Sequence, residues 1–392
     1  MSSARGGSMD EDEAVAWAIE ELVAQIEIRS ISDHEDRMMA YLDARCRALG
    51  FPTTVQPIEG AGPNVVVRWD GRTDPPDLLL TAHTDTIDPV WDWRDVATVD
   101  GTVVTGLGAQ DDKGCGVAIL LGAVLAREAG VDLSATSVAL GFVVDEEVGG
   151  KGSRALADSL RPRFVVASEG SELDIATVET GFLDGWVRVP GATMHGSLPE
   201  EADNAVEKAA RLLLALLEAP FTSISHPIAG PNTVTAQRIE SSSAMNAIPD
   251  VANMYISCRV FGEPSLDETR KEIEAICRRV GATFELHDQG GWWETPQDAP
   301  LVEALIRASE QAIGRTPGFT RMPAWTDAHS FFDRCGSEVV VFGPGHLRAA
   351  HRPDEHLDAR DLVRCARVFA ALIADTASLS TAEPTRSKEG VR

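Results

Sequence analysis

Residues 78–85 read LLLTAHTD and residues 138–147 read VALGFVVDEE, and these two stretches decide the fold. Each is a short apolar run that ends in ionisable side chains: His83 and Asp85 in the first, Asp145, Glu146 and Glu147 in the second. Short apolar runs are typical of buried strands, and open α/β sheets place their ligand sites at the carboxyl ends of parallel strands. Histidines and carboxylates gathered at such an edge indicate a metal-dependent hydrolase.

The composition indicates a large, acidic protein of two domains. The chain has 392 residues, 44% of them hydrophobic, which is enough for a sizeable core and too long for one compact domain. With 61 acidic and 35 basic residues its net charge is −26, and such a surface repels phosphate backbones and anionic membranes. We therefore expect no nucleic-acid partner and no membrane partner, and no apolar run reaches transmembrane length.

The cysteines and the first residues predict a cytoplasmic protein. The six cysteines form no C-x-x-C pair and have no spacing typical of a secreted disulfide framework. The first ten residues lack the apolar segment of a signal peptide. Buried thiols in a reducing compartment are the expectation.

Alternating helical and strand patterns predict an α/β fold with a mostly parallel sheet flanked by helices. Before residue 181, helical patterns over 11–28, 38–49 and 114–129 alternate with strand patterns over 53–58, 65–69, 78–82, 138–144 and 164–167. After residue 295 the alternation of helix and strand patterns resumes, with helices over 301–313 and 362–373 and a strand over 339–342.

The intervening segment has a different pattern. Strands are expected over 183–190, 232–240, 251–260 and 282–287, and helices over 203–218 and 266–279, which is an α+β arrangement. We therefore predict a discontinuous catalytic domain over 11–181 and 295–376 and an inserted domain over 182–294. The ends, 1–10 and 377–392, are polar and are expected to be disordered tails.

The pairs His83–Asp85 and Asp111–Asp112 each allow two interpretations. His83 and Asp85 lie two apart at a strand end, so one side chain can bind a metal while the other orients it. A loop histidine beside a capping aspartate would show the same pattern. Asp111 and Asp112 follow a glycine turn and precede an apolar helix, so they can cap that helix or bridge two cations.

The acidic cluster at 145–147 is more specific. Three carboxylates at the end of a buried strand repel one another unless cations or solvent compensate. One glutamate can then coordinate a metal while another takes a proton from a metal-bound water; a solvated acidic turn is the alternative. Glu169 follows the strand 164–167, and His351 follows a glycine turn whose backbone N–H groups can approach a ligand. An ordinary loop acid and a surface histidine are the alternatives for these two.

Together these motifs resemble a known family. Their order, His83…Asp111…Glu146-Glu147…Glu169…His351, is similar to that of the dinuclear zinc peptidases, which include glutamate carboxypeptidases, acetylornithine deacetylases, succinyl-diaminopimelate desuccinylases, aminoacylases and tripeptide aminopeptidases. The resemblance covers about 11–376. It extends to further matches in the second half of the chain: Met194-His195-Gly196-Ser197, Asn204-Ala205, Asn246, Ile248-Pro249, Arg259 and Thr326-Asp327-Ala328.

The resemblance implies a fold and a metal centre. The fold would be zinc-exopeptidase-like, with the inserted domain acting as a lid and dimerisation domain. His83, Asp111 and Glu169 would hold one metal ion, and Asp111, Glu147 and His351 the other, with Asp111 bridging. Zinc is the expected metal, and manganese or cobalt would suit the same ligands. Glu146 would be the general base, Asp85 the residue that orients His83, and the bond Asp111–Asp112 is often cis in the family.

The resemblance also assigns roles to the second half of the chain. His195 would reach the active site of a neighbouring subunit and stabilise the tetrahedral oxyanion, which implies a homodimer. Asn246 and Arg259, with the backbone at Gly343 and Gly345, would hold a substrate carboxylate. The chain departs from the family at Ala202 and at Ala324-Trp325, where glycines are common.

We therefore expect an enzyme that cleaves an amide bond of a small N-acyl amino acid or a short peptide with a free carboxylate. A hydroxide that bridges the metals would attack the carbonyl, with Glu146 as base. The alternatives are an exopeptidase or dipeptidase, and an aminohydrolase whose flat pocket is lined by Trp325 and Trp292-Trp293. An inactive binding protein on the same scaffold is a more distant alternative, disfavoured because every ligand candidate and Glu146 are present.

Overall fold

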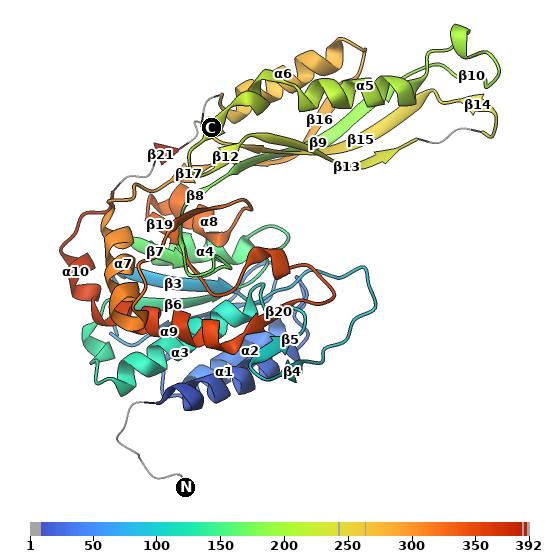
Figure 1. Ribbon diagram of the computed structural model, residues 1–392. Coiled ribbons are helices and arrows are strands. Elements are labelled where there is room, and N and C mark those ends of the chain that lie inside the picture. The colour runs from blue at the N-terminus through green and yellow to red at the C-terminus, as the bar shows by residue number, and fades with distance from the viewer. Residues whose placement is uncertain (1–8, 242–243, 263, 386–387, 390–392) are drawn as a thin grey trace. The chain divides into compact units, whose positions relative to one another are not determined.

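The computed structural model describes residues 9–241, 244–262, 264–385 and 388–389 and divides into two compact units (Figure 1). The first unit comprises Met1–Thr177, Thr295–Thr320 and Thr326–Ser387. The second comprises Val178–Glu294, Arg321–Trp325 and Lys388–Arg392. The chain thus leaves the first unit at Val178 and returns at Thr295, close to the limits that the sequence pattern predicts for the insertion.

A mixed sheet forms the centre of the first unit. Its strands follow the order β1-β2-β6-β3-β7-β19-β8, with the bounds Thr53–Gln56, Asn64–Arg68, Val138–Val143, Leu78–His83, Phe164–Ala167, Glu338–Val341 and Ile175–Glu179. The four central strands β6, β3, β7 and β19 are parallel and buried along their whole length, which explains their continuous apolar sequences. Strands β1, β2 and β8 pair antiparallel, so the predicted parallel sheet holds for the centre and not for the edges.

Helices cover both faces of this sheet, as predicted. On one face α1 (Glu11–Ile26), α3 (Lys113–Glu128), α7 (Pro300–Ile313) and α9 (Ala359–Ala374) pack against one another, and α4 (Lys151–Leu160) packs with α8 (Asp327–Cys335) on the other (Figure 1). Helix α2 (Asp36–Ala48) packs against β1 and β2. Gly122 allows the close contact of α3 with α9, because a Cβ at that position would lie 2.8 Å from Phe369 Cβ. Helix α3 is thereby fixed with its N-terminus, and the preceding Asp111–Asp112, at the edge of the sheet.

A small sheet lies beside the segment that carries Asp111. Its strands follow the order β20-β5-β4, with the bounds His356–Asp358, Val103–Thr105 and Thr98–Asp100. Strand β5 precedes Asp111 and β20 follows His351, and they pair antiparallel, with Leu357 opposite Val104. The pairing therefore aligns two segments that are far apart in the sequence and that each carry a predicted metal ligand.

The chain ends are more ordered than predicted. Residues 377–385 were expected to be disordered, but Thr376–Ser380 form α10. Leu379 is buried, and Arg163 Nη1 donates to the carbonyl oxygens of Leu379 and Ser380 at 3.4 and 3.3 Å. Asp10 caps α1 through a capping box with Glu13. The remaining predicted tail residues, 1–8, 386–387 and 390–392, lie outside the described part of the chain.

The second unit is built on an antiparallel sheet of order β13-β15-β9-β16, with the bounds Thr233–Glu240, Val251–Val260, Gly181–Pro190 and Thr283–Gly290. Buried and partly exposed residues alternate along β9, because one sheet face packs against α5 (Ala205–Leu217) and α6 (Leu266–Arg278). The two short strands β10 (Met194–His195) and β14 (Ala247–Ile248) pair with each other.

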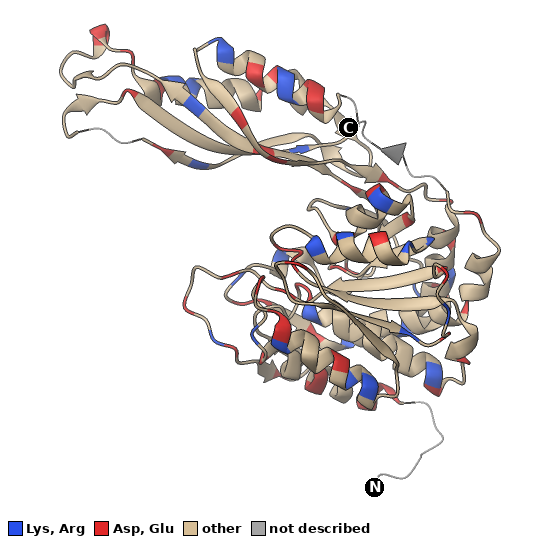
Figure 2. Ribbon diagram, turned by 180° about the vertical axis from the view of Figure 1, so that it is seen from behind, with Lys and Arg blue, Asp and Glu red and all other residues tan. Residues whose placement is uncertain are grey.

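The remaining short elements of the described residues are four 3₁₀ helices and five short strands: η1 Leu133–Ala135, η2 Pro199–Glu201, η3 Pro220–Ser223, η4 Leu347–Ala349, β11 Ser225–His226, β12 Gly230–Pro231, β17 Trp293–Glu294, β18 Phe319–Met322 and β21 Lys388–Glu389. All six cysteines are free thiols, and only Cys335 is partly exposed. Asp and Glu residues occur along the ribbon of both units (Figure 2). Among the described residues, each helix is too short or too polar to cross a bilayer.

Candidate metal centre

The predicted metal ligands converge at the carboxyl edge of the sheet in the first unit. His83 is the last residue of β3, Glu147 follows β6 and Glu169 follows β7, and these three strands are adjacent and parallel. Asp111 directly precedes the Asp112 cap of α3, and His351 lies between η4 and β20. The fold therefore brings together side chains from five separate segments of the chain.

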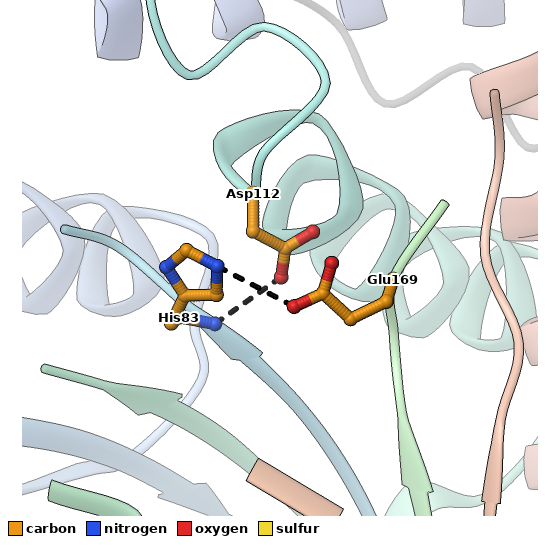
Figure 3. Close-up of side chains that lie close together, drawn as sticks. All are labelled: His83, Asp112 and Glu169. Carbon is orange, nitrogen blue, oxygen red and sulfur yellow. Dashed lines mark hydrogen bonds and ion pairs between the residues drawn. The ribbon is translucent and has the colours of Figure 1, made fainter. Parts of the chain in front are cut away.

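The first cluster forms around His83. Its Nε2 atom lies 2.9 Å from Asp111 Oδ1 and 3.4 Å from Glu169 Oε1. His83 and Glu169 point toward each other, and Asp112 points at the backbone of His83 (Figure 3). His83, Asp112 and Glu169 are all buried and offer ligand atoms within 4.8 Å of one another. The donors are one imidazole and carboxylates, a set that suits zinc, manganese or cobalt.

The second cluster forms around His351. Its Nε2 atom lies 3.0 Å from Glu147 Oε1 and 3.3 Å from Asp111 Oδ2. Asp111 thus faces His83 with one carboxylate oxygen and His351 with the other. This is the arrangement expected of a carboxylate that bridges two cations.

Asp112 also belongs to the site, although the resemblance gives a ligand role to Asp111 alone of this pair. Its Oδ2 atom accepts the backbone N–H of His83 at 3.2 Å, while its buried Oδ1 atom has no hydrogen-bond partner among the described residues. The bond Asp111–Asp112 is cis, as the resemblance implies. The sequence shows that Asp112 can cap the helix or bind cations, but the direction of its side chain depends on the backbone of the turn.

The electrostatics of the cluster favour the binding of cations. Burial raises the pKa of Glu146 well above its ordinary value and that of Glu169 to about 7, and the nearby charge of Asp327 adds to both shifts. Hydrogen bonds to Asp111 and Glu147 raise the pKa of His351 to about 10. Burial opposes ionisation of Asp111, but its hydrogen bonds with His351 and His83 prevail and lower its pKa. Protons are therefore held tightly between these groups, and divalent cations would replace them.

Glu146 borders the first cluster without being close to the second histidine. Its Oε2 atom lies 3.9 Å from His83 Nε2, and its side chain is almost fully buried. The turn that carries it begins at Asp145, which has a positive φ of 67° and whose carboxylate accepts the N–H of Lys151 at 3.0 Å. The turn directs Glu146 and Glu147 to different places, one beside His83 and one beside His351.

Asp85 has a broader role than the predicted orientation of His83. The His83 Nδ1 atom is closer to the Asp85 carbonyl oxygen, at 3.0 Å, than to its carboxylate, at 3.4 Å. The carboxylate accepts the backbone N–H groups of Glu146 and Glu147, both at 3.1 Å, and the hydroxyl of Ser32 at 2.8 Å. Asp85 therefore fixes the backbone under the two glutamates as well as the imidazole.

His195 and Asn246 lie close together in the second unit. His195 pairs with Ala247 across β10 and β14, and the N–H of Gly196 donates to the Asn246 carbonyl oxygen at 2.6 Å. The His195 side chain is exposed, with Nδ1 2.7 Å from Ser197 Oγ.

Arg259 lies at the other end of β15, where it faces Asp184 at 3.9 Å. The nine residues from Val251 to Arg259 span about 26 Å of strand, so Asn246 and Arg259 of one chain lie toward opposite ends of β15. That the two residues hold a substrate carboxylate stays a prediction.

The glycine turn makes hydrogen bonds within the first unit. The N–H of Gly343 donates to Ser171 Oγ at 3.0 Å, and the Gly343 carbonyl accepts the N–H of Leu173. That the backbone at Gly343 and Gly345 holds a substrate carboxylate stays a prediction. Gly345 has a positive φ of 64°, and its neighbours Pro344 and His346 bond to the side chain of Gln110. The turn thus supports the segment that leads to Asp111.

Comparisons with known proteins identify relatives of this chain. The model of the peptidase family M20/M25/M40 matches residues 79–375. The chain is 28% identical to an acetylornithine deacetylase of Myxococcus xanthus, over 86% of this chain and 91% of that protein. It is 27% identical to a probable carboxypeptidase of Aspergillus terreus, over 89% of this chain and 84% of that one. A tripeptidase structure from Staphylococcus aureus has a TM-score of 0.78 at 19% identity and covers 95% of this chain and 100% of its own. The family model matches residues 79–375, which is more than half of the chain, and the fold and the cluster of histidines and carboxylates agree with that match. The chain therefore belongs to the peptidase family M20/M25/M40.

Proposed function

We propose that the protein hydrolyses an amide bond of a small N-acyl amino acid, or of a short peptide, that carries a free carboxylate. The main support is the position of Asp111 between the two clusters: its two carboxylate oxygens lie 2.9 Å from His83 Nε2 and 3.3 Å from His351 Nε2. His83, Asp111 and Glu169 would hold one divalent cation, and Asp111, Glu147 and His351 the other. Zinc is the first candidate, and manganese or cobalt would suit the same donors.

The residues around this pair define the chemistry. Two bound cations would supply the acidity that makes a water nucleophilic at neutral pH, and would polarise the amide carbonyl. Glu146 takes the proton of the attacking water and returns it to the departing amine, a task that suits a buried carboxylate with a raised pKa. The exposed imidazole of His195 donates a hydrogen bond to the tetrahedral oxygen. Arg259 pairs with the substrate carboxylate.

The substrate class is supported by the relatives, one named an acetylornithine deacetylase and one a probable carboxypeptidase. The chain is a metal-dependent hydrolase, so the inactive binding protein is set aside. The aminohydrolase alternative loses two of its three proposed pocket residues, because Trp293 is fully buried and Trp292 packs on Phe261 with ring centroids 4.3 Å apart. The third, Trp325, is partly exposed. An exopeptidase that acts on a peptide with a free carboxylate would use the same site, and its substrate would differ in the acyl group.

A panel of substrates tests this proposal. We expect purified protein supplied with Zn²⁺, Mn²⁺ or Co²⁺ to hydrolyse N-acetyl or N-succinyl amino acids, or dipeptides, and to lose this activity with a chelator. Converting the substrate carboxylate to an amide should lower kcat/KM by roughly 100-fold or more, because Arg259 then loses its charged partner. The matched control is a substrate that keeps the free carboxylate and changes only the amino-acid side chain. Absence of amide cleavage with every metal, or equal cleavage of the amidated substrates, would contradict the proposal.

We further propose that the enzyme is a homodimer whose subunits share active sites. His195 and Asn246 lie at one end of the second unit and Arg259 at the other, so two copies are needed to bring all three to one substrate. The outer side of α5 carries exposed apolar side chains that suit contact with a second copy: Val206 at 41%, Leu214 at 61% and Leu217 at 46% exposure.

Charges on this face of α5 should separate the subunits. We expect the double substitution Leu214→Glu and Leu217→Glu to halve the mass measured by sedimentation equilibrium, because two acids on each copy would repel across the interface. Turnover should fall with the loss of the dimer, since each site then lacks the partner's His195. The control is Arg211→Glu, an exposed position on the same helix that changes charge without removing apolar surface. A double variant that stays dimeric, or a monomer with full turnover, would refute the shared site.

A further inference from the structure

Glu355 is a buried acid in an otherwise exposed segment. Residues 351–356 read HRPDEH, and of these six only Glu355 is buried, with 2% of its surface exposed. A single buried carboxylate between exposed neighbours has a large desolvation cost, so strong hydrogen bonds must compensate it. Its contacts therefore indicate what the segment does.

The side-chain hydrogen bonds of Glu355 go to the segment that carries Asp111. Its Oε1 atom accepts the backbone N–H of Gln110 at 2.9 Å and that of Asp111 at 3.0 Å. Its backbone carbonyl accepts the N–H of Gly106 at 3.0 Å. One residue thus holds the chain at both ends of the turn 106–111, directly beyond the ladder between β5 and β20.

These bonds bear on the metal centre because of where Asp111 points. The Asp111 carboxylate must face His83 on one side and His351 on the other, so a small rotation of its backbone would move one oxygen away from its cluster. Glu355 lies four residues after His351, and its carboxylate accepts the backbone N–H of Asp111 itself. It therefore couples the segment of the second histidine to the orientation of the bridging carboxylate.

We propose that Glu355 is a positioning residue that sets the bridging orientation of Asp111 and thereby the affinity of both metal sites. It acts through Asp111 and does not itself contact a cation. The role parallels that of Asp85, which accepts the consecutive amides of Glu146 and Glu147. Two buried carboxylates would thus each hold one of the two turns that supply the centre. The inference rests on the proposed two-metal site.

Metal titration of the full-length protein tests the role. Co²⁺ is the probe, with its two dissociation constants measured by competition with a chromophoric chelator. We expect Glu355→Leu, which has no acceptor, to weaken both sites by roughly 10–100-fold, the effect of losing a partner that orients a ligand. Glu355→Gln keeps an oxygen that can accept both amides and should stay within about threefold of the unchanged protein, well short of that loss. Glu355→Asp, one methylene shorter, should give an intermediate loss and provides the decisive comparison if the leucine variant does not fold.

The controls separate this role from simple stabilisation. Asp354→Asn changes the adjacent, exposed acid, whose carboxylate pairs with Arg352 at the surface, and should leave both constants unchanged. A merely structural Glu355 would lower the melting temperature of the leucine or aspartate variant while the folded protein kept both affinities, and that result would overturn the inference. If the unchanged protein itself bound fewer than two Co²⁺ ions, the proposed two-metal function would fail instead.

Discussion

Replacing Glu146 with glutamine is expected to lower kcat by roughly 10²–10⁴-fold while both metal ions stay bound. Glutamine keeps the shape of the side chain but cannot take a proton from the attacking water. Glu146 lies 3.9 Å from His83 Nε2 and is held through its backbone by Asp85, so the substitution should leave the ligands in place. Steady-state kinetics and metal content of the same preparation measure the two effects together.

The matched control for this change is Glu27→Gln. Glu27 is an exposed glutamate at the end of α1, far in sequence from every ligand, and its substitution should leave kcat unchanged. If the Glu146→Gln protein turned over at the normal rate, another group would have to be the base. If it lost a metal ion, Glu146 would act as a ligand instead.

Replacing Asp111 with asparagine is expected to weaken both metal sites and abolish turnover. Asp111 presents one carboxylate oxygen to each of the two histidines, and an uncharged amide offers only one oxygen to two cations. The loss of affinity should exceed the roughly 10–100-fold that follows the removal of an orienting partner. Metal content after dialysis, with the dissociation constants for Co²⁺, measures this effect.

Two single-site variants give the comparison that makes this result specific. Glu169→Gln removes a ligand only from the first cluster, and His351→Ala removes one only from the second. Each of these variants should lose the ion of its own cluster more readily than the other ion, whereas Asp111→Asn should weaken the binding of both ions. An Asp111 variant that lost a single ion, like the other two, would show that the carboxylate does not bridge.

The strands and the ligand types could be predicted because they depend on local sequence. LLLTAHTD and VALGFVVDEE each place polar groups directly after a buried strand, and the structure brings His83, Glu147, Glu169, Asp111 and His351 to one edge of the sheet. Parallel strands end at the same edge, so the convergence follows from the topology. The antiparallel edges could not be read from apolar runs, because strand direction depends on the connections between strands.

The residues that hold the ligands in place could not be predicted from their spacing. Glu355 and the carboxylate of Asp85 accept backbone N–H groups, which every residue except proline possesses, so no sequence pattern reveals these contacts. The same limit applies to the N–H of Gly343, which donates to the hydroxyl of Ser171 in a distant segment. Asn246 and Arg259 both match the family, but matching letters do not show that β15 separates them.

Anomalous diffraction from crystals grown with Zn²⁺ tests directly whether Asp111 bridges two metal ions. Data collected on both sides of the zinc edge locate each ion independently of the protein atoms. We expect two peaks per chain, one between His83 and Glu169 and one between Glu147 and His351, with a different oxygen of Asp111 bonded to each. One peak alone, or two peaks of which only one contacts Asp111, would contradict this expectation.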